Sequence, residues 1–110
     1  MKIQKNTILG AMIQATKKTT MWIIPPEGPI QEREIDACPE YAEIRDIVGG
    51  TIEIVRVIVD GIETELICND NGMFFDLPEN PRALSRVEHT DALMPRLYGT
   101  VIIFSEPTVI

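Results

Sequence analysis

The chain has 110 residues, a length that corresponds to one domain with a single hydrophobic core. Apolar residues make up 45% of it and charged residues 25%, which excludes an intrinsically disordered chain. The net charge of −7 disfavours binding to nucleic-acid backbones and anionic membranes, because such binding requires clustered basic residues. Acidity also serves solubility, so the charge by itself identifies no partner.

The sequence carries no pattern of export or membrane insertion. Its beginning lacks the apolar run and small-residue cleavage site of a signal peptide, and no apolar run reaches membrane-spanning length. We therefore expect a cytoplasmic protein. In that compartment the two cysteines, Cys38 and Cys68, are expected to be buried free thiols and not a disulfide.

Residues 1–19 are predicted to form an N-terminal arm, and residues 20–110 a single α+β domain. All acidic residues follow Pro26, whereas the arm is basic through Lys2, Lys5, Lys17 and Lys18. Three interpretations of the arm stay open: a short helix capped by Thr7, a mobile segment, or a segment that is ordered only by a partner chain. The arm is the main reason to expect a homo-oligomer.

The first half of the domain is predicted to contain one strand and one helix. Residues 20–24 are typical of a strand that ends at a Pro-Pro pair, and residues 27–36 of a turn with a short extended piece. A helix with Pro39 in its first turn follows and ends at a Gly-Gly pair. Its apolar face is expected to consist of Tyr41, Ile44, Ile47 and Val48.

Residues 51–75 give the clearest structural signal. Three runs, 51–59, 62–69 and 73–75, are separated by Asp-Gly and Asn-Gly pairs, which are typical of tight hairpin turns. These runs predict an antiparallel meander. Apolar residues occur on both faces of the first run, so we expect it to be a central strand that is covered on both sides.

The rest of the chain is predicted to complete the sheet. Residues 81–87 fit a short helix with Asn80 as its cap and Pro81 in its first position. Residues 100–104 fit a closing strand. The expected fold class is therefore α+β, with the meander and the closing strand packed against one or two short helices.

The sequence contains no recognisable catalytic or metal-binding constellation. Cys38, Cys68 and His89 are scattered without the spacing of metal ligands, and the remaining ligands of a calcium loop are missing. The single histidine has no nucleophile at a strand-to-helix elbow to activate, and no nucleotide-binding glycine pattern occurs. We therefore predict a protein that is not an enzyme, with no catalytic residues, no metal and no cofactor.

One group of polar and aromatic residues is a candidate ligand site: Trp22, Asn69, Phe75, Asn80, Arg82 and Arg86. A structural interpretation assigns Asn71 to a turn, Asn80 to a helix cap and the arginines to nearby acids. A functional interpretation assigns the group to a nucleotide-derived ligand. In it the two arginines contact phosphate, Asn69 and Asn80 read polar edges, and Phe75 or Trp22 stacks on a base.

A family resemblance is carried by three stretches, "IRDIVGGTIEIV", "ICNDNGMFFDLPENPRA" and "LYGTVIIF". They resemble the consensus of a small domain of unknown function that is widespread in phages and mobile elements, and the match covers residues 21–104. The matching positions, which include a Val-Gly-Gly helix end and a Leu-Pro-x-Asn-x-x-Ala segment, are Val48, Gly49, Gly50, Asn69, Gly72, Leu77, Pro78, Asn80 and Ala83. The resemblance implies no activity and assigns no catalytic residue.

A looser similarity concerns phage anti-defence proteins, called sponges, that sequester the nucleotide signals of Thoeris and CBASS immunity. It implies a protein that binds a cyclic nucleotide or cyclic ADP-ribose derivative without cleaving it, and this is the leading functional hypothesis. The alternative is an acidic inhibitor or nucleic-acid mimic that docks on a host defence protein. Its basis is the concentration of acidic residues between Glu27 and Glu65. Neither hypothesis includes direct binding to DNA or RNA.

Overall fold

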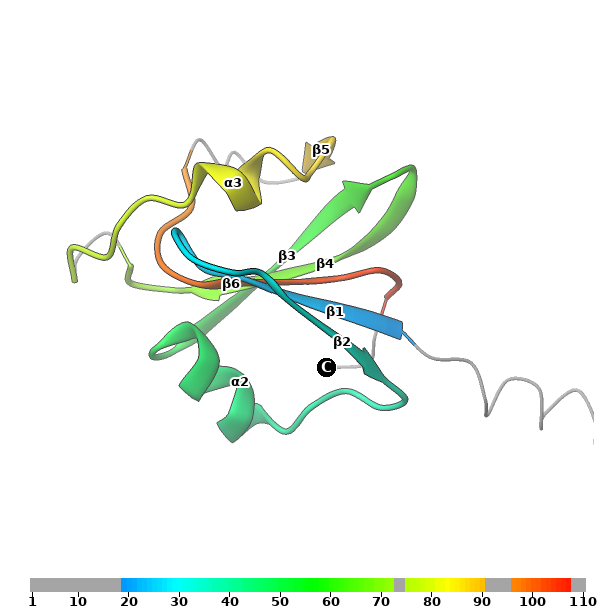
Figure 1. Cartoon of the computed structure of the whole chain (residues 1–110), viewed down its shortest axis with the longest axis horizontal. Coiled ribbons are helices and arrows are strands. Elements are labelled where there is room, and N and C mark those ends of the chain that lie inside the picture. The colour runs from blue at the N-terminus through cyan, green and yellow to red at the C-terminus, as the bar shows by residue number, and fades with distance from the viewer. Residues whose placement is uncertain (1–18, 73–74, 91–95, 108–110) are drawn as a thin grey trace, which may run out of the picture.

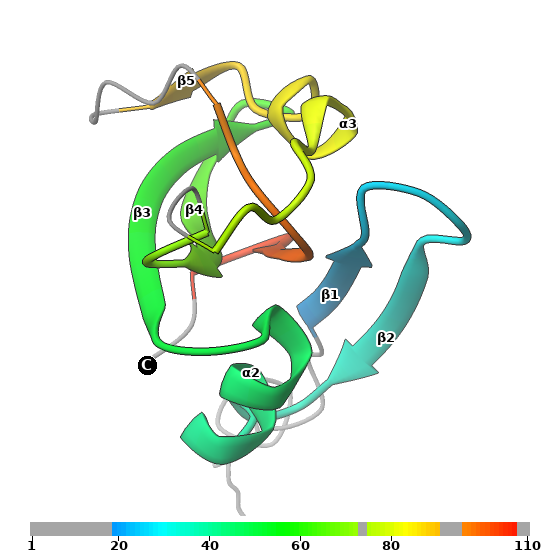
Figure 2. The same ribbon diagram turned by 90° about the vertical axis from the view of Figure 1, so that its left-hand side faces the viewer.

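The computed structural model describes residues 19–72, 75–90 and 96–107. They form a six-stranded antiparallel sheet with the order β2-β1-β6-β4-β3-β5 and two short helices on its opposite faces (Figures 1 and 2). The strands are β1 (Thr19–Ile24), β2 (Gln31–Ile35), β3 (Ile52–Val59), β4 (Ile62–Asn69), β5 (His89–Thr90) and β6 (Val101–Phe104), and the helices are α2 (Tyr41–Val48) and α3 (Pro81–Leu84). This agrees with the α+β class. The predicted arm, up to residue 18, lies outside the described residues.

β1 and β2 form a hairpin at one edge of the sheet. β1 ends at Ile24, directly before the Pro-Pro pair, which confirms the predicted strand. The extended piece predicted within residues 27–36 is β2, which is antiparallel to β1 with Met21 opposite Arg33. The first four residues of β2 are exposed, so this strand meets solvent along most of its length.

α2 covers one face of the sheet with its last two turns. The helix begins at Tyr41, with Glu40 as N-cap, so Pro39 precedes the helix and does not lie in its first turn. Gly49 adopts φ 86° and ends it, as predicted. Ile44 and Val48 are buried, but Tyr41 is 55% exposed, so the predicted apolar face was wrong at its first position. The Tyr41 ring lies outside the core, 5.8 Å from the Arg45 guanidinium carbon.

The β3–β4 hairpin confirms the first two strands of the predicted meander. Asp60 (φ 52°) and Gly61 (φ 78°) both have positive φ, as tight hairpin turns require. Of the predicted third strand, residues 73 and 74 lie outside the described residues, and Phe75 lies in a turn. In this turn the Phe75 N–H donates to the Asn71 carbonyl (3.2 Å). The second neighbour of β4 is β6.

β6, and not β3, is the strand that is covered on both faces. All four residues of β6 are buried, and it lies between β1 and β4. β3 lies near the other edge, beside the two-residue β5. One of its faces is buried through Val55, Val57 and Val59, whereas Ile54 on the other face is 46% exposed. The expectation that β3 is covered on both sides was therefore wrong, because the cluster under α2 reaches β3 only at Ile52 and leaves Ile54 uncovered.

Two apolar clusters lie on either side of the sheet. The cluster under α2 consists of Met21, Ile23, Ile44, Val48, Ile67, Ile102 and Phe104. The cluster on the α3 side includes Ile24, Val55, Val57, Leu66, Ala83, Leu97, Val101 and Ile103. Among the described helices none is long and apolar enough to cross a membrane.

The segment before α3 packs tightly against the segment before β6. The Leu77 N–H donates to the Gly72 carbonyl (3.0 Å) and the Gly99 N–H donates to the Pro78 carbonyl (2.7 Å). A Cβ atom added at Gly99 would lie only 2.9 Å from Leu77 Cδ1, and Gly99 has φ +74°. This crossing therefore requires glycine for its backbone conformation, and an added Cβ would displace the end of the Leu77 side chain.

We predict that Gly99→Ala lowers the free energy of unfolding by about 2–4 kcal/mol. The strained φ contributes about 1–2 kcal/mol, and overpacking against Leu77 adds about 1–2 kcal/mol. The matched control is Gly61→Ala, because Gly61 has φ +78° but nothing within 4 Å of an added Cβ. Urea unfolding of both variants measures the difference, and equal losses would show that Leu77 moves aside without cost.

Candidate functional site

Asn80 is fully buried and its side chain makes three hydrogen bonds within the protein. Its Nδ2 donates to the carbonyls of Ile24 and Gly99, both at 2.8 Å, and its Oδ1 accepts from the Ala83 N–H at 3.1 Å. The Ala83 contact confirms the predicted helix cap. With 0% exposure and both amide hydrogens donated, Asn80 has no group directed at a ligand in this structure.

Arg82 ties α3 to the loop between β1 and β2. Its Nη1 donates to the Gly28 carbonyl at 2.7 Å and to the Pro25 carbonyl at 3.2 Å. Arginine is suited to this role because its planar fork presents several donors at once. The guanidinium that was predicted to contact phosphate thus holds two backbone carbonyls. The structural interpretation from the sequence, an ion pair of this arginine with nearby acidic residues, also differs from these contacts.

Asn69 joins the end of β4 to the end of α2. Its Nδ2 donates to the Val48 carbonyl (3.2 Å), and its Oδ1 accepts from the Asn71 N–H (2.8 Å). Val48 is in the last turn of α2, where carbonyls have no partner within the helix. A Cβ at Gly50 would approach Asn69 Nδ2 to 3.0 Å, so glycine allows this close contact.

The other three predicted site residues are not joined to these by hydrogen bonds in the described part of the chain. Trp22 is half-buried and packs against the cluster on the α3 side. Phe75 is 68% exposed in the turn after β4, and Arg86 is exposed after α3. The six residues therefore do not form one pocket in this structure, and their role in ligand binding stays a prediction.

A different surface is distinguished by its charge. Residues 27–46, which we call the acidic segment, contain seven acidic residues and two arginines, a net charge of −5. All nine charged side chains are exposed. The acidic segment runs through β2 and most of α2, and an ion pair of 3.0 Å between Arg33 and Glu43 links the strand to the helix. The ion pair thus connects β2, at the edge of the sheet, with α2, and the acidic side chains of the segment are distributed over both elements. Figure 2 shows the two elements at this part of the molecule.

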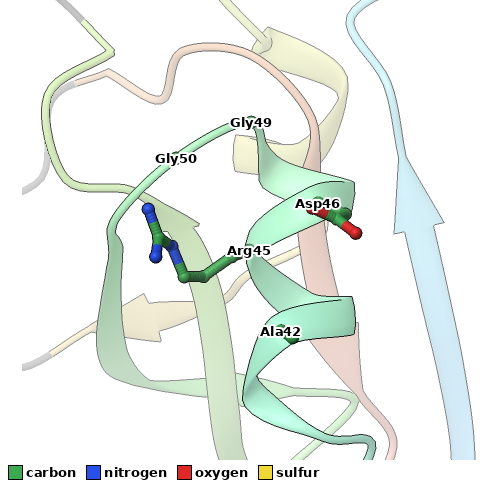
Figure 3. A pocket seen from close by; sticks show the side chains of 5 residues that line it. All are labelled: Ala42, Arg45, Asp46, Gly49 and Gly50. Carbon is green, nitrogen blue, oxygen red and sulfur yellow. The ribbon is translucent and has the colours of Figure 1, made fainter.

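A hollow lies on the solvent side of α2, with a cavity volume of about 360 Å³ (Figure 3). It is lined by Ala42, Arg45, Asp46, Gly49 and Gly50. Its chemistry is unfavourable for phosphate, because it lies at the negative end of the helix dipole and includes the Asp46 carboxylate. The N–H groups of Gly49 and Gly50 both donate to the Arg45 carbonyl, so they are not free for an anion.

Cys68 is buried and its thiol is protonated at neutral pH. Burial, followed by the negative charges of Glu53 and Asp70, raises the pKa of Cys68 from 9.0 to about 11. A thiol in this state is a poor nucleophile and a poor metal ligand. The second cysteine, Cys38, is half-buried, and its Sγ donates to the Pro39 carbonyl at 3.4 Å. Neither cysteine is part of a disulfide. Cys68 is buried as predicted, whereas Cys38 is only half-buried, so the prediction of two buried thiols was wrong for Cys38.

Comparison with known proteins identifies the family of the chain. A family model for a domain of unknown function, DUF3846, matches residues 18–108. The chain belongs to the DUF3846 family. No curated protein and no solved structure matches it. The matched range contains every strand and helix of the described structure, so the family corresponds to this fold as a whole.

The acidic segment could have been located from the sequence more closely than it was. The signal is the density of negative charge. The net charge is −5 in residues 27–46 and −6 in the much longer range 47–110. The pairing of β2 with β1 could not be read from composition, because "QEREI" lacks the apolar alternation of a typical strand. The position of the acidic segment at the edge of the sheet could therefore be learned only from the structure.

Replacement of Asn80 by alanine is expected to lower the free energy of unfolding by about 3 kcal/mol or more, because two buried carbonyls lose their donor and the helix loses its cap. Asn71→Ala is the control, since its side chain makes one exposed contact of 3.4 Å to Thr51 Oγ1. Thermal and urea unfolding measure both variants. A stable Asn80→Ala protein would contradict the internal role of this side chain.

The raised pKa of Cys68 predicts a loss of stability in alkaline solution. Above pH 9.0 the unfolded thiol begins to lose its proton, whereas the folded thiol keeps it until pH rises through about 11. Since the folded state then binds more protons, the free energy of unfolding falls between these two pH values. Urea unfolding across this range should show a steeper fall for the natural protein than for Cys68→Ala. Identical slopes would contradict the shift.

Proposed function

We propose that this chain is a non-catalytic binding protein that docks on a basic surface of another protein through its acidic segment. The observation that carries the proposal is that all nine charged side chains of residues 27–46 are exposed and sum to −5. The phage setting implied by the sequence resemblance suggests a host defence protein as the partner.

Both arginines of the acidic segment already have partners within the protein, so most of its negative charge is left for a binding partner. Arg33 is engaged by Glu43, and the Arg45 guanidinium lies over the Tyr41 ring. The remaining acidic side chains have no ion-pair partner among the described residues; they are Glu27, Glu32, Glu34, Asp36, Glu40 and Asp46. Such a surface attracts a basic partner and accelerates association.

Sequestration of a nucleotide-derived signal is the second candidate function. The hollow beside α2 favours it, because about 360 Å³ is within the range of small-ligand sites and a guanidinium and an aromatic ring lie close to it. Asp46 and the helix end oppose it, because both repel phosphate. The internal hydrogen bonds of Asn80, Arg82 and Asn69 also leave the originally predicted pocket without most of its polar groups.

Neutralisation of the acidic segment tests the docking proposal. We expect Glu34→Gln/Asp36→Asn to weaken partner binding about tenfold, through slower association. The control, Glu53→Gln/Asp70→Asn, has the same net charge and removes exposed acids outside the segment. The measurement is quantitative capture of host proteins by each immobilised variant at 0.1 M and 1 M salt, where the screening length falls from about 10 to about 3 Å. Equal capture by both variants would contradict the proposal.

Native mass spectrometry separates the two candidate functions. The purified protein is incubated with cyclic dinucleotides, cyclic trinucleotides and cyclic ADP-ribose isomers, and its mass is compared with that of the untreated protein. Docking through the acidic segment predicts no stoichiometric mass increase. A stoichiometric increase, with the ligand recovered intact after denaturation, would replace the docking proposal by sequestration.

A further inference from the structure

We propose that the outer edge of β2 accepts an extended segment of the partner protein that carries Lys or Arg at alternate positions. The segment would become a seventh strand of the sheet. This inference rests on the proposed docking through the acidic segment and specifies its geometry.

The outer edge of β2 is open within the described structure. β2 is the first strand of the sheet order and pairs only with β1 among the described strands. Figure 2 shows β2 beyond β1 at the side of the sheet. Open edges are the sites where extended peptides add to a sheet, because their N–H and C=O groups lack partners.

The backbone groups that point outward belong to Glu32 and Glu34. The Thr20 N–H donates to Ser105 Oγ and the Thr20 carbonyl accepts from the Ser105 N–H, both at 2.9 Å, so the backbone of Thr20 faces the β6 side. Because direction alternates along a strand, Met21 faces β2 and pairs with Arg33. The neighbours of Arg33 in β2 therefore direct their N–H and C=O groups away from β1.

The same two residues also present the carboxylates. Side chains alternate along β2, so Glu32 and Glu34 share one face, whereas Arg33 lies on the other face with Glu43 of α2. In an added strand, the residues directly opposite Glu32 and Glu34 are two positions apart and place their side chains on that same face. Basic residues at these two positions would form hydrogen bonds through their backbones and ion pairs through their side chains.

A second copy of this chain is a poor occupant of the edge. Antiparallel pairing of two β2 strands through their outward groups places Glu32 opposite Glu34 of the second copy, or places one of these residues opposite itself. Like charges directly opposite each other destabilise a strand pair. The charges therefore select against self-association at this edge and in favour of a basic strand. The predicted homo-oligomer would require a different surface.

The test uses the full chain and a synthetic peptide, Thr-Lys-Val-Lys-Val-Lys-Thr. Isothermal titration measures peptide binding, and amide hydrogen exchange by NMR reports on the edge. We expect the Glu32 and Glu34 amides to exchange about tenfold more slowly with peptide bound, whereas the Arg33 amide, already bonded to β1, is unchanged. Binding should weaken about tenfold in Glu34→Lys and stay unaltered in the exposed, distant control Glu53→Lys.

Backbone methylation of the peptide separates strand addition from simple charge attraction. N-methylation of two lysine amides, which removes donors to β2, is expected to weaken binding about tenfold or more. N-methylation of the two valine amides, which face away, is expected to leave binding within about threefold. Equal binding by both methylated peptides would overturn strand addition while leaving docking through the acidic segment intact.

Two further results would also overturn the inference. The first is failure of the unmethylated peptide to bind at all. The second is slow exchange of the Glu32 and Glu34 amides in the protein alone together with a dimer mass in native mass spectrometry, because a second copy would then occupy the edge. Neither result depends on the capture experiment with Glu34→Gln/Asp36→Asn, whose failure would instead remove the docking proposal itself.

Discussion

The fold depends on the buried carboxamide of Asn80 more than on any other polar group. It connects three parts of the chain that are far apart in sequence: the end of β1 through Ile24, the start of α3 through Ala83, and the approach to β6 through Gly99. An amide can make all three contacts because it carries two donors on one atom and an acceptor on the other. A carboxylate at this position would keep the cap but present negative oxygen to two carbonyls.

This junction accounts for part of the sequence pattern that carries the family resemblance. Leu77, Ala83 and Gly99 surround the same crossing, where a larger residue at Gly99 meets Leu77 and where Ala83 is fully buried. Asn69 performs a similar task at the end of α2. Residues that look like a binding motif in the sequence are therefore placed where the backbone must cross closely. This is a structural reason for the presence of these residues.

Local signals were read correctly from the sequence, and those that depend on distant partners were not. The end of α2 at Gly49, the hairpin at Asp60 and the cap at Asn80 each follow from the conformation of a few neighbouring residues. The position of β6 between β1 and β4 does not, because strand order is decided by pairing across the chain. Arg82 shows the same limit: its charge suggested an anion, whereas its partners are carbonyls of a loop over fifty residues away.

The negative charge on β2 has two physical consequences: it disfavours pairing with other edge strands in general, and it favours pairing with basic strands. Acidic side chains on an edge strand prevent uncontrolled pairing with other edges, which protects the protein from aggregation. The protection is selective, however, since repulsion acts on neutral-to-acidic strands and becomes attraction for basic ones. Among the described strands the outward backbone groups of Glu32 and Glu34 have no partner, and under our proposal they pair with a strand that satisfies this charge requirement. An edge of this kind excludes copies of itself and admits a narrow class of partners, which is what a specific docking surface requires.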